Sequence, residues 1–435
     1  MDAEPTIPDE IAATVIDPKA YAADKPVHDA FAWIRANRPL AKAHLEGISP
    51  FWIVSKHADI LEVSRQNDLF HSGDRSTTFT SIEGDKRIRE MTGGSPHLVR
   101  TLVQMDAPDH PKYRVLTQSW FLPQNIRRLE DRIREIAREH VARMAGRSSG
   151  GWGECDFVTD VALTYPLRVI MEIMGVPEGD EPRMLRLTQE LFGASDPELN
   201  RSRKGWEDRV DDGGGLADLQ ATIADFFMYF KKITDDRKAA PGADLATVIA
   251  NGTIDEAPIS DFEAMSYYVI VATAGHDTTS SSTAGAMWAM AENPDVLAKI
   301  KSDPGLIPGL VEESIRWVTP VKHFMRSATR DAEIRGMAIA KGDWLMLCYP
   351  SGNRDEEVFE DPFVFRPDRS PNRHLSFGYG AHLCLGQHLA KMEMRILWEE
   401  LLPKLRSVTL AGEPSRSEGA FVGGPKRLPI RFEMA

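Results

Sequence analysis

Cysteine, positive charge and long apolar runs are all scarce in this chain. Its 435 residues contain three cysteines, Cys155, Cys348 and Cys384, which are too few for a disulfide framework and are typical of a reducing compartment. The 52 lysines and arginines are outnumbered by 65 acidic residues, and the net charge of −13 argues against a nucleic-acid partner. The acidic residues 1–5 contain no apolar segment resembling a signal peptide or a membrane anchor. We therefore expect a soluble, cytoplasmic protein that binds neither nucleic acid nor membranes.

The length and composition are sufficient for a large buried core. With 42% hydrophobic residues, a chain of 435 residues can enclose a bulky cofactor. Two glycine-rich stretches, 146–154 and 211–215, are interpreted as surface loops rather than as domain boundaries. We therefore expect residues 1–435 to form a single domain.

The spacing of apolar residues predicts mostly helix with a minority of strand. Helical periodicity predicts helices at 126–144, 216–237, 261–292, 308–318 and 384–405. Short apolar runs predict strands at 51–54 and 344–349. The fold class that these patterns indicate is α+β, dominated by helix.

The most informative segment is a glycine-rich loop that ends at Cys384, immediately before a helical pattern. At a helix N-terminus, unpaired backbone N–H groups and the helix dipole favour the thiolate form of a sulfur. Gly378 and Gly380 permit a tight turn and a close backbone approach to a flat cofactor, and Gly386 leaves room on the first helical turn. Phe377 can cover the sulfur and keep water away from it. The pattern is typical of a thiolate ligand to a haem iron.

Three other interpretations of the loop are weaker. A lone cysteine is most often a small buried hydrophobe, but that role does not need the flanking glycines. A zinc site built from His382, Cys384 and His388 lacks a second cysteine and an evident fourth ligand. A nucleotide-binding loop needs the G-x-G-x-x-G spacing, which this segment lacks.

The loop resembles the cysteine-ligand loop of the cytochrome P450 family, and the resemblance extends over nearly the whole chain. It is strongest to the soluble bacterial, terpineol-hydroxylating members, although Arg366 stands where Asp is common. The resemblance implies that family's fold, with a large helical lobe and a smaller β-rich lobe. It also implies haem b with the Cys384 thiolate as axial ligand. The other cofactor contacts that it implies from this loop and from the central helix are Ala274, Phe377, Gly378 and Gly386.

A second motif, residues 272–279, lies within the long apolar pattern that begins near residue 261. Glycine costs about 1 kcal/mol relative to alanine in a helix, and a threonine hydroxyl can bond the i−4 carbonyl, so we expect a kink here. From the residues alone, a helix end followed by Asp277 as a new N-cap is equally possible. The resemblance implies instead that Asp277 and Thr278 form an acid–alcohol pair that delivers protons to bound O₂. We expect His276 to point away from the iron.

A third motif, Glu313 and Arg316, is an acid–base pair three residues apart on an amphipathic pattern. Such pairs are usually exposed and contribute only about 0.3–0.5 kcal/mol. The resemblance implies a buried pair that is joined by Arg369 and holds the scaffold beside the haem.

Haem propionates entering an apolar cavity need charge-assisted donors. Read singly, each basic residue is more often a surface cation. The resemblance nominates four propionate anchors at matching places: His110, Arg114, Arg326 and His382.

The substrate pocket is inferred only from the resemblance, and its residues are mostly apolar. They favour a compact, hydrophobic ligand, such as a cyclic monoterpenoid or an alkyl-aromatic hydrocarbon. The implied pocket residues are Phe79, Ile270, Val271, Ala274, Val321, His323, Phe324, Phe421 and Val422.

The resemblance implies a monooxygenase that uses O₂ and two electrons. The electrons would come from a [2Fe–2S] ferredoxin, served by a separate NADH-dependent reductase. We expect the ferredoxin to dock on the face nearest Cys384 through basic residues: Lys112, Arg114, Arg373, His388 and Lys391. Two alternatives remain open at this point, a peroxygenase that uses hydrogen peroxide directly and a non-catalytic haem or gas sensor.

Overall fold

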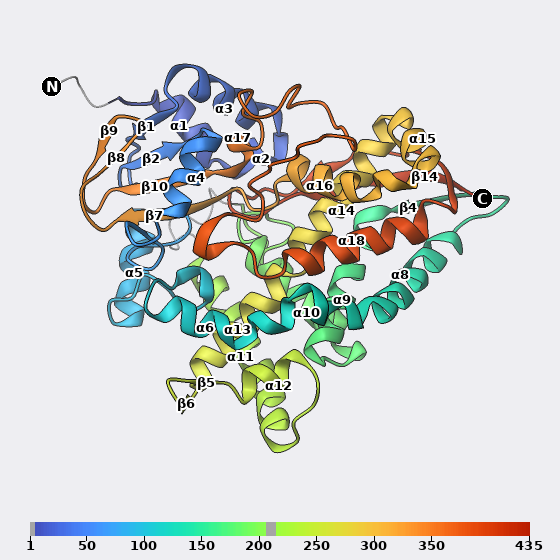
Figure 1. The fold of residues 1–435 in the computed structure, drawn as a ribbon, viewed down its shortest axis with the longest axis horizontal. Helices are drawn as coiled ribbons and strands as arrows, with labels where there is room; N and C mark the ends of the chain where they lie inside the picture. The colour runs from blue at the N-terminus through green and yellow to red at the C-terminus, as the bar shows by residue number, and fades with distance from the viewer. Residues whose placement is uncertain (1–4, 206–214) are drawn as a thin grey trace.

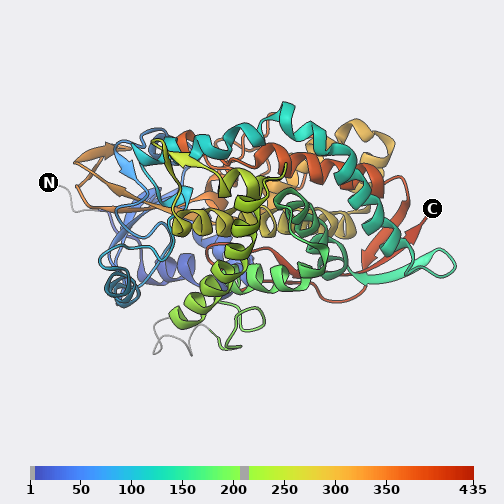
Figure 2. The ribbon, with the colours of Figure 1, turned by 90° about the horizontal axis from the view of Figure 1, so that it is seen from below.

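The computed structural model describes residues 5–205 and 215–435. Helices fill one end of the molecule, and a five-stranded sheet with the N-terminal helices forms the other (Figure 1). The two chain termini lie at opposite ends in both views (Figure 2). The predicted α+β class and the two unequal lobes are therefore confirmed. Within the described residues, no helix is long and apolar enough to cross a membrane.

The helices of the first half of the chain are α1 (Asp9–Ile16), α2 (Pro18–Ala23), α3 (Lys25–Asn37), α4 (His57–Arg65), α5 (Ile82–Thr92), α6 (Asp109–Gln118), α7 (Pro123–Ile126), α8 (Glu130–Ala145), α9 (Thr164–Met174) and α10 (Glu181–Phe192). Those of the second half are α11 (Leu216–Ala239), α12 (Leu245–Ala250), α13 (Asp261–Ala274), α14 (Asp277–Glu292), α15 (Pro294–Ser302), α16 (Ile307–Val318), α17 (Tyr349–Gly352) and α18 (Gln387–Leu401).

The strands are β1 (Leu40–Ala43), β2 (Phe51–Val54), β3 (Phe70–His71), β4 (Trp152–Asp156), β5 (Thr253–Ile254), β6 (Ala257–Pro258), β7 (His323–Ala328), β8 (Ala332–Ile334), β9 (Met337–Ile339), β10 (Trp344–Cys348), β11 (Leu405–Leu410), β12 (Ser415–Arg416), β13 (Pro425–Arg427) and β14 (Pro429–Met434).

The five-stranded sheet has the order β1-β2-β10-β7-β3. Its central strand β10 runs parallel to β2, with Trp344 opposite Phe51, and antiparallel to β7. Every residue of β2 and β10 is buried, as expected for continuous apolar runs in the middle of a sheet that is covered on both faces. The strand predicted at 51–54 is confirmed, and the one predicted at 344–349 ends one residue earlier.

The predicted helices are present; two of them, α11 and α16, differ from the prediction by one or two residues at one end, and the other three differ more. The pattern at 126–144 is divided between α7 and α8 by a short 3₁₀ turn, and the pattern at 261–292 is divided between α13 and α14. The helix predicted from residue 384 begins at Gln387 and ends at Leu401, after which Leu405 begins a strand. Apolar residues keep their helical spacing across such junctions, because the same face stays buried where the backbone leaves the α-helical conformation. The spacing alone therefore does not mark where each helix begins or ends.

The glycine-rich stretch 146–154 is only in part the surface loop that the sequence predicts. Trp152 begins β4, which pairs antiparallel with β14 from the end of the chain. Its alternation of exposed and buried residues is short, and one of the two buried positions is Gly153, which has no side chain to signal it, so the strand depends on a distant partner rather than on local pattern. The loop predicted at 211–215 falls outside the described residues, except for Gly215.

Candidate functional site

The glycine-rich loop folds back so that Cys384 lies close to its start. The Cys384 N–H donates to the Phe377 carbonyl over 2.9 Å, and the Gly378 N–H donates to the Leu375 carbonyl over 2.8 Å. Gly378 and Gly380 have φ of 68° and 72°, and a Cβ on Gly380 would lie 2.1 Å from the Ser64 carbonyl oxygen. Glycine at 380 is therefore required both by the turn and by the close approach of α4. At Gly386, by contrast, a Cβ would meet no atom within 4 Å.

Helix α18 begins three residues after Cys384, and its first N–H groups interact with the sulfur. Burial raises the pKa of the Cys384 thiol, whereas the backbone N–H groups of Gly386 and Gln387 and the nearby Arg114 act in the opposite direction. Cys384 is partly accessible, while Cys155 and Cys348 are buried. Burial raises the pKa of Cys155 to about 12, so that thiol is inert. Cys384 is the cysteine placed to act as a ligand.

The central helix is broken where the sequence predicts a kink. Helix α13 ends at Ala274 and α14 begins at Asp277, and the Thr278 hydroxyl donates to the Ala274 carbonyl over 2.8 Å. Ala274 is exposed and Val271 is partly exposed, although Ala272 and Thr273 between them are buried. One side of this helix thus stays accessible inside the helical lobe.

The side chains beside the kink point in different directions. His276 is fully buried, with its ring nitrogens 2.8 Å from the Leu163 carbonyl and 3.2 Å from the Thr188 hydroxyl. The structure therefore gives His276 a structural role. Asp277 has a buried oxygen, Oδ2, with no hydrogen-bond partner among the described residues. An unpaired buried carboxylate oxygen is costly unless a further group is bound there.

The four basic residues expected near the propionates lie together, although they come from three separate segments: α6, β7 and the cysteine loop. The rings of His110 and His382 are 4.4 Å apart, and Arg114 Nη2 donates to the Leu383 carbonyl over 2.8 Å. Burial lowers the pKa of His382, and the charges of Arg326, His110 and Arg114 lower it further. His382 also lies 3.2 Å from the Ser72 hydroxyl, a neighbour that no sequence pattern indicated.

This basic cluster has one carboxylate near it, Asp106, whose charge acts to raise the pKa of His110 and of Arg326. Within the residues that the structure describes, none of the four forms an ion pair with a carboxylate, and Arg326 is 6% exposed. Among the described residues, the side chain of Arg326 donates only to the Met325 carbonyl, and His110 Nε2 is buried without a hydrogen-bond partner. Such an unpaired cluster is suited to carboxylates of a bound group.

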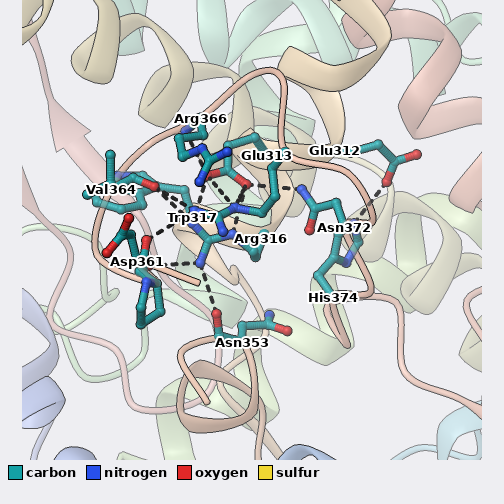
Figure 3. A network of polar contacts seen from close by, with 12 residues as sticks. Glu312, Glu313, Arg316, Trp317, Asn353, Asp361, Val364, Arg366, Asn372 and His374 are labelled. Carbon is teal, nitrogen blue, oxygen red and sulfur yellow. Dashed lines mark hydrogen bonds and ion pairs between the residues drawn. The ribbon is translucent and has the colours of Figure 1, made fainter. Parts of the chain in front are cut away.

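Glu313 is the centre of a buried polar network that joins three segments (Figure 3). Its carboxylate accepts from Arg316 Nε and Nη2 over 2.8 and 2.7 Å, and from Arg369 Nε over 3.1 Å. Asn372 Nδ2 and the Arg366 backbone N–H donate to the same carboxylate over 3.0 and 2.9 Å. Because Arg366 contributes only its backbone here, its departure from the family pattern leaves the network intact.

Phe421 connects most of the expected substrate-pocket residues. Its ring lies 5.6 Å from the His323 ring and 5.5 Å from the Phe324 ring, and Val321 bridges to Val422 next to it. Phe192 at the end of α10 lies 6.3 Å from Phe421 and was not predicted, because its distance along the chain hides this contact.

Phe79, and the expected pocket residues on α13, are placed differently from the aromatic group formed by Phe421, His323 and Phe324. The Phe79 ring packs against Phe51 and Trp344 of the sheet, and only its backbone N–H reaches the group, donating to His323 Nε2 over 3.0 Å. Ile270 and Val271 lie on the accessible side of α13 with Ala274.

Comparisons with known proteins agree with this geometry. The family model for cytochrome P450 matches residues 83–303 and 306–428. This chain is a cytochrome P450. It is 49% identical to cytochrome P450-terp of a Pseudomonas species over the full length of both chains. It is 33% identical to a steroid C26-monooxygenase of Mycolicibacterium smegmatis, over 89% of this chain and 84% of that protein.

Solved structures place this P450 among bacterial members of the family. CYP108D1 of Novosphingobium aromaticivorans superposes with a TM-score of 0.89 at 47% identity, covering 99% of this chain and 100% of that one. CYP268A2 of Mycobacterium marinum, solved with pseudoionone, has a TM-score of 0.85 at 28% identity, with the same coverage. The likeness to terpineol-hydroxylating members is confirmed, and the protein is an oxidoreductase of the monooxygenase class.

P450 enzymes carry haem b held by a cysteine thiolate, and the residues present here fit that group. The loop offers one partly accessible thiol with backbone donors behind it. The basic cluster offers partners for two propionates, including the unpartnered His110 Nε2. The accessible side of α13 completes an apolar wall.

Proposed function

We propose that this P450 hydroxylates a small hydrophobic substrate, either a cyclic monoterpenoid or an alkyl-aromatic hydrocarbon. The observation that carries the proposal is the full-length identity of 49% to cytochrome P450-terp, together with the largely aromatic group around Phe421. The pseudoionone bound by a second relative is likewise a largely apolar molecule. Two electrons per turnover would come from a [2Fe–2S] ferredoxin and its NADH-dependent reductase, in the cytoplasm. The 435 residues would act as one haem domain.

The roles of the residues follow from their placement. When bound, the haem supplies O₂ activation at its iron. Cys384 would hold the iron, with the Gly386 and Gln387 N–H groups stabilising the charge on its sulfur. His110, Arg114, Arg326 and His382 would bind the propionates and fix the orientation of the ring.

Asp277 and Thr278 would control proton delivery. The Thr278 hydroxyl donates its own proton to the Ala274 carbonyl, so its oxygen lone pairs remain free to accept a hydrogen bond from a water. Asp277 Oδ2, which has no partner among the described residues, can take up a proton and pass it on.

Replacing Thr278 by alanine tests this role. Thr278→Ala should still bind haem but divert electrons to hydrogen peroxide, because the water that carries the proton loses its acceptor. Product and peroxide formed per NADH oxidised measure the effect, and Thr278→Ser, which retains the hydroxyl, should stay close to the parent ratio. Full coupling in Thr278→Ala would contradict the proposed role.

A ligand titration tests the substrate class. Cyclic terpenoids and substituted benzenes should convert the ferric protein from low spin to high spin, as followed in the ultraviolet–visible spectrum, and the best ligands should then be hydroxylated with ferredoxin and NADH. Turnover with hydrogen peroxide alone at an equal rate would support the peroxygenase alternative. A ferrous carbonyl spectrum typical of imidazole ligation would overturn the assignment of Cys384.

A further inference from the structure

A second cavity, of about 400 Å³, lies beside the Glu313 network and has a lining distinct from the haem and substrate sites described above. It is bounded by α2 and α3, by the ends of α14 and α16, and by the β12–β13 hairpin. Cys384, Asp277 and Thr278 do not line it, and no residue of the expected substrate pocket does. Cavities of ~300–1,000 Å³ commonly hold small-molecule ligands.

Aromatic side chains form much of the wall of this second cavity. Trp288 of α14, Trp317 of α16 and Phe363 all line it. Each lies beneath a positive charge: the Arg416 guanidinium carbon is 4.3 Å from the Trp288 ring, and that of Arg354 is 4.6 Å from Trp317 and 5.7 Å from Phe363. The wall is therefore suited to a flat apolar body next to a negative group.

Two cations in the lining lack an acidic partner. Lys322 Nζ donates to the Val318 and Thr319 carbonyls over 3.0 and 2.9 Å, which uses two of its three N–H groups. Arg354 donates to the Trp317 carbonyl over 2.8 Å, and its Nε is buried without a partner in the described residues. Across residues 5–205 and 215–435, neither cation lies within ion-pair distance of a carboxylate, whereas Arg416 pairs with Asp24 at 3.4 Å.

The pKa values of Lys322 and Arg354 reflect their burial as positive charges. Burial lowers the pKa of Lys322 to about 7; the charge of Asp24 opposes this shift, and the charges of Arg416 and Arg354 add to it. Burial likewise lowers the pKa of Arg354 to about 9. A bound anion would stabilise the charged form of each group, because an opposite charge favours that form.

We propose that this second cavity binds an aromatic monocarboxylate, with its carboxylate on Lys322 and Arg354 and its ring against Trp288, Trp317 and Phe363. A single negative charge fits better than a phosphate dianion, because the carbonyls at the C-terminus of α16 and the carboxylates of Asp24 and Glu292 also surround the space. The inference does not depend on the proposed hydroxylation.

The test uses the haem-loaded enzyme and benzoate as the probe, with binding followed by calorimetry. Imidazole at the iron keeps the haem pocket occupied, and the Soret band reports any displacement. Benzoate should bind at one saturable site that imidazole does not affect. Benzamide has nearly the same shape without the charge. It should bind at least about tenfold more weakly than benzoate, since a hydrogen bond to a charged group is lost. Inorganic phosphate should not compete.

Variants locate the site. Lys322→Met should weaken benzoate binding by about tenfold or more, whereas Lys322→Arg should stay within about threefold, since only the former removes the charge. Lys341→Met, at an exposed position outside the cavity lining, controls for the change in total charge. If Lys322→Met fails to fold, Phe363→Ser decides, because Phe363 is 48% exposed and its loss removes one aromatic wall.

Three binding results would overturn the proposal: no saturable benzoate binding, displacement of benzoate by imidazole, or equal affinity for benzoate and benzamide. Unchanged benzoate affinity in Lys322→Met would also overturn it. Where Lys322→Met does not fold, unchanged affinity in Phe363→Ser would do so. Competition by phosphate with equal affinity would replace the aromatic carboxylate by a general anion site.

Discussion

Single residues in this P450 have roles that depend on which hydrogen bonds they accept, and His323 is an instructive case. Its Nε2 accepts from the Phe79 N–H over 3.0 Å, so its Nδ1 carries the proton and donates to the Ala420 carbonyl over 2.9 Å. The ring is neutral and ties together three segments that flank the expected pocket. The sequence-based interpretation as a pocket residue could not show this, because both partners are backbone atoms from distant positions.

Replacing His323 should change the response of stability to pH. Burial lowers its folded-state pKa from 6.5 to about 4. Below pH 6.5 the unfolded chain binds a proton that the folded chain does not, so stability falls between pH 6.5 and about 4 and changes no further below that. The full loss for this one group is on the order of 3 kcal/mol.

His323→Gln, which keeps an acceptor but cannot titrate, should lose less stability over that range. Urea unfolding midpoints at pH 7 and pH 4.5 measure the difference. His140, whose pKa burial also lowers to about 4, remains in both proteins and serves as the internal reference. Equal losses in the parent and in His323→Gln would exclude the proposed linkage.

At the scale of elements, local chemistry determined what the sequence could predict. The kink between α13 and α14 was predictable, because Gly275 and the Thr278 hydroxyl weaken the helix within a few residues. The strand β4 was not, because it is formed by pairing with β14 almost three hundred residues later. The basic cluster lies between these cases: its residues were found by resemblance, whereas their lack of acidic partners emerged only from the fold.

The helix α16 also shows how burial changes the weight of a sequence pair. Glu313 and Arg316 are both 0% exposed, and removing the carboxylate would leave Arg316 and Arg369 buried without compensation. Glu313→Gln should therefore destabilise the protein by about 3–5 kcal/mol.

The neighbouring Glu312 provides a matched control for that change. It pairs with His374 and Lys391 but is 33% exposed, so Glu312→Gln should cost about 1 kcal/mol or less. Chemical denaturation of both variants, with haem retention read from the spectrum, compares the two costs. Similar losses of stability in Glu312→Gln and Glu313→Gln would show that burial does not determine how much the Glu313 network stabilises the protein.

At the scale of the whole molecule, the net charge of −13 contrasts with the basic residues expected near Cys384 for ferredoxin docking. The structure modifies the expected docking set, because Lys391 is paired with Glu312 at 2.7 Å and Lys112 is paired with Asp255. Arg114 donates to the Leu383 carbonyl. Arg373 and His388 stay exposed, and Arg65 lies 5.0 Å from the ring of the exposed Tyr379 in the cysteine loop.

Arg373 is therefore a better test of ferredoxin docking than Lys391. Lys391→Glu would also place a second carboxylate beside Glu312. Arg373→Glu should slow reduction by ferredoxin by about three- to tenfold at low ionic strength, because a surface charge acts mainly on the association rate. The difference should shrink as salt is added, since exposed charges are screened over about 10 Å at 0.1 M. Stopped-flow reduction at several salt concentrations measures both effects, and Lys341→Glu, which follows β9, should leave the rate unchanged. If Arg373→Glu and Lys341→Glu were reduced at the same rate at every salt concentration, the ferredoxin would have to approach another face of the enzyme.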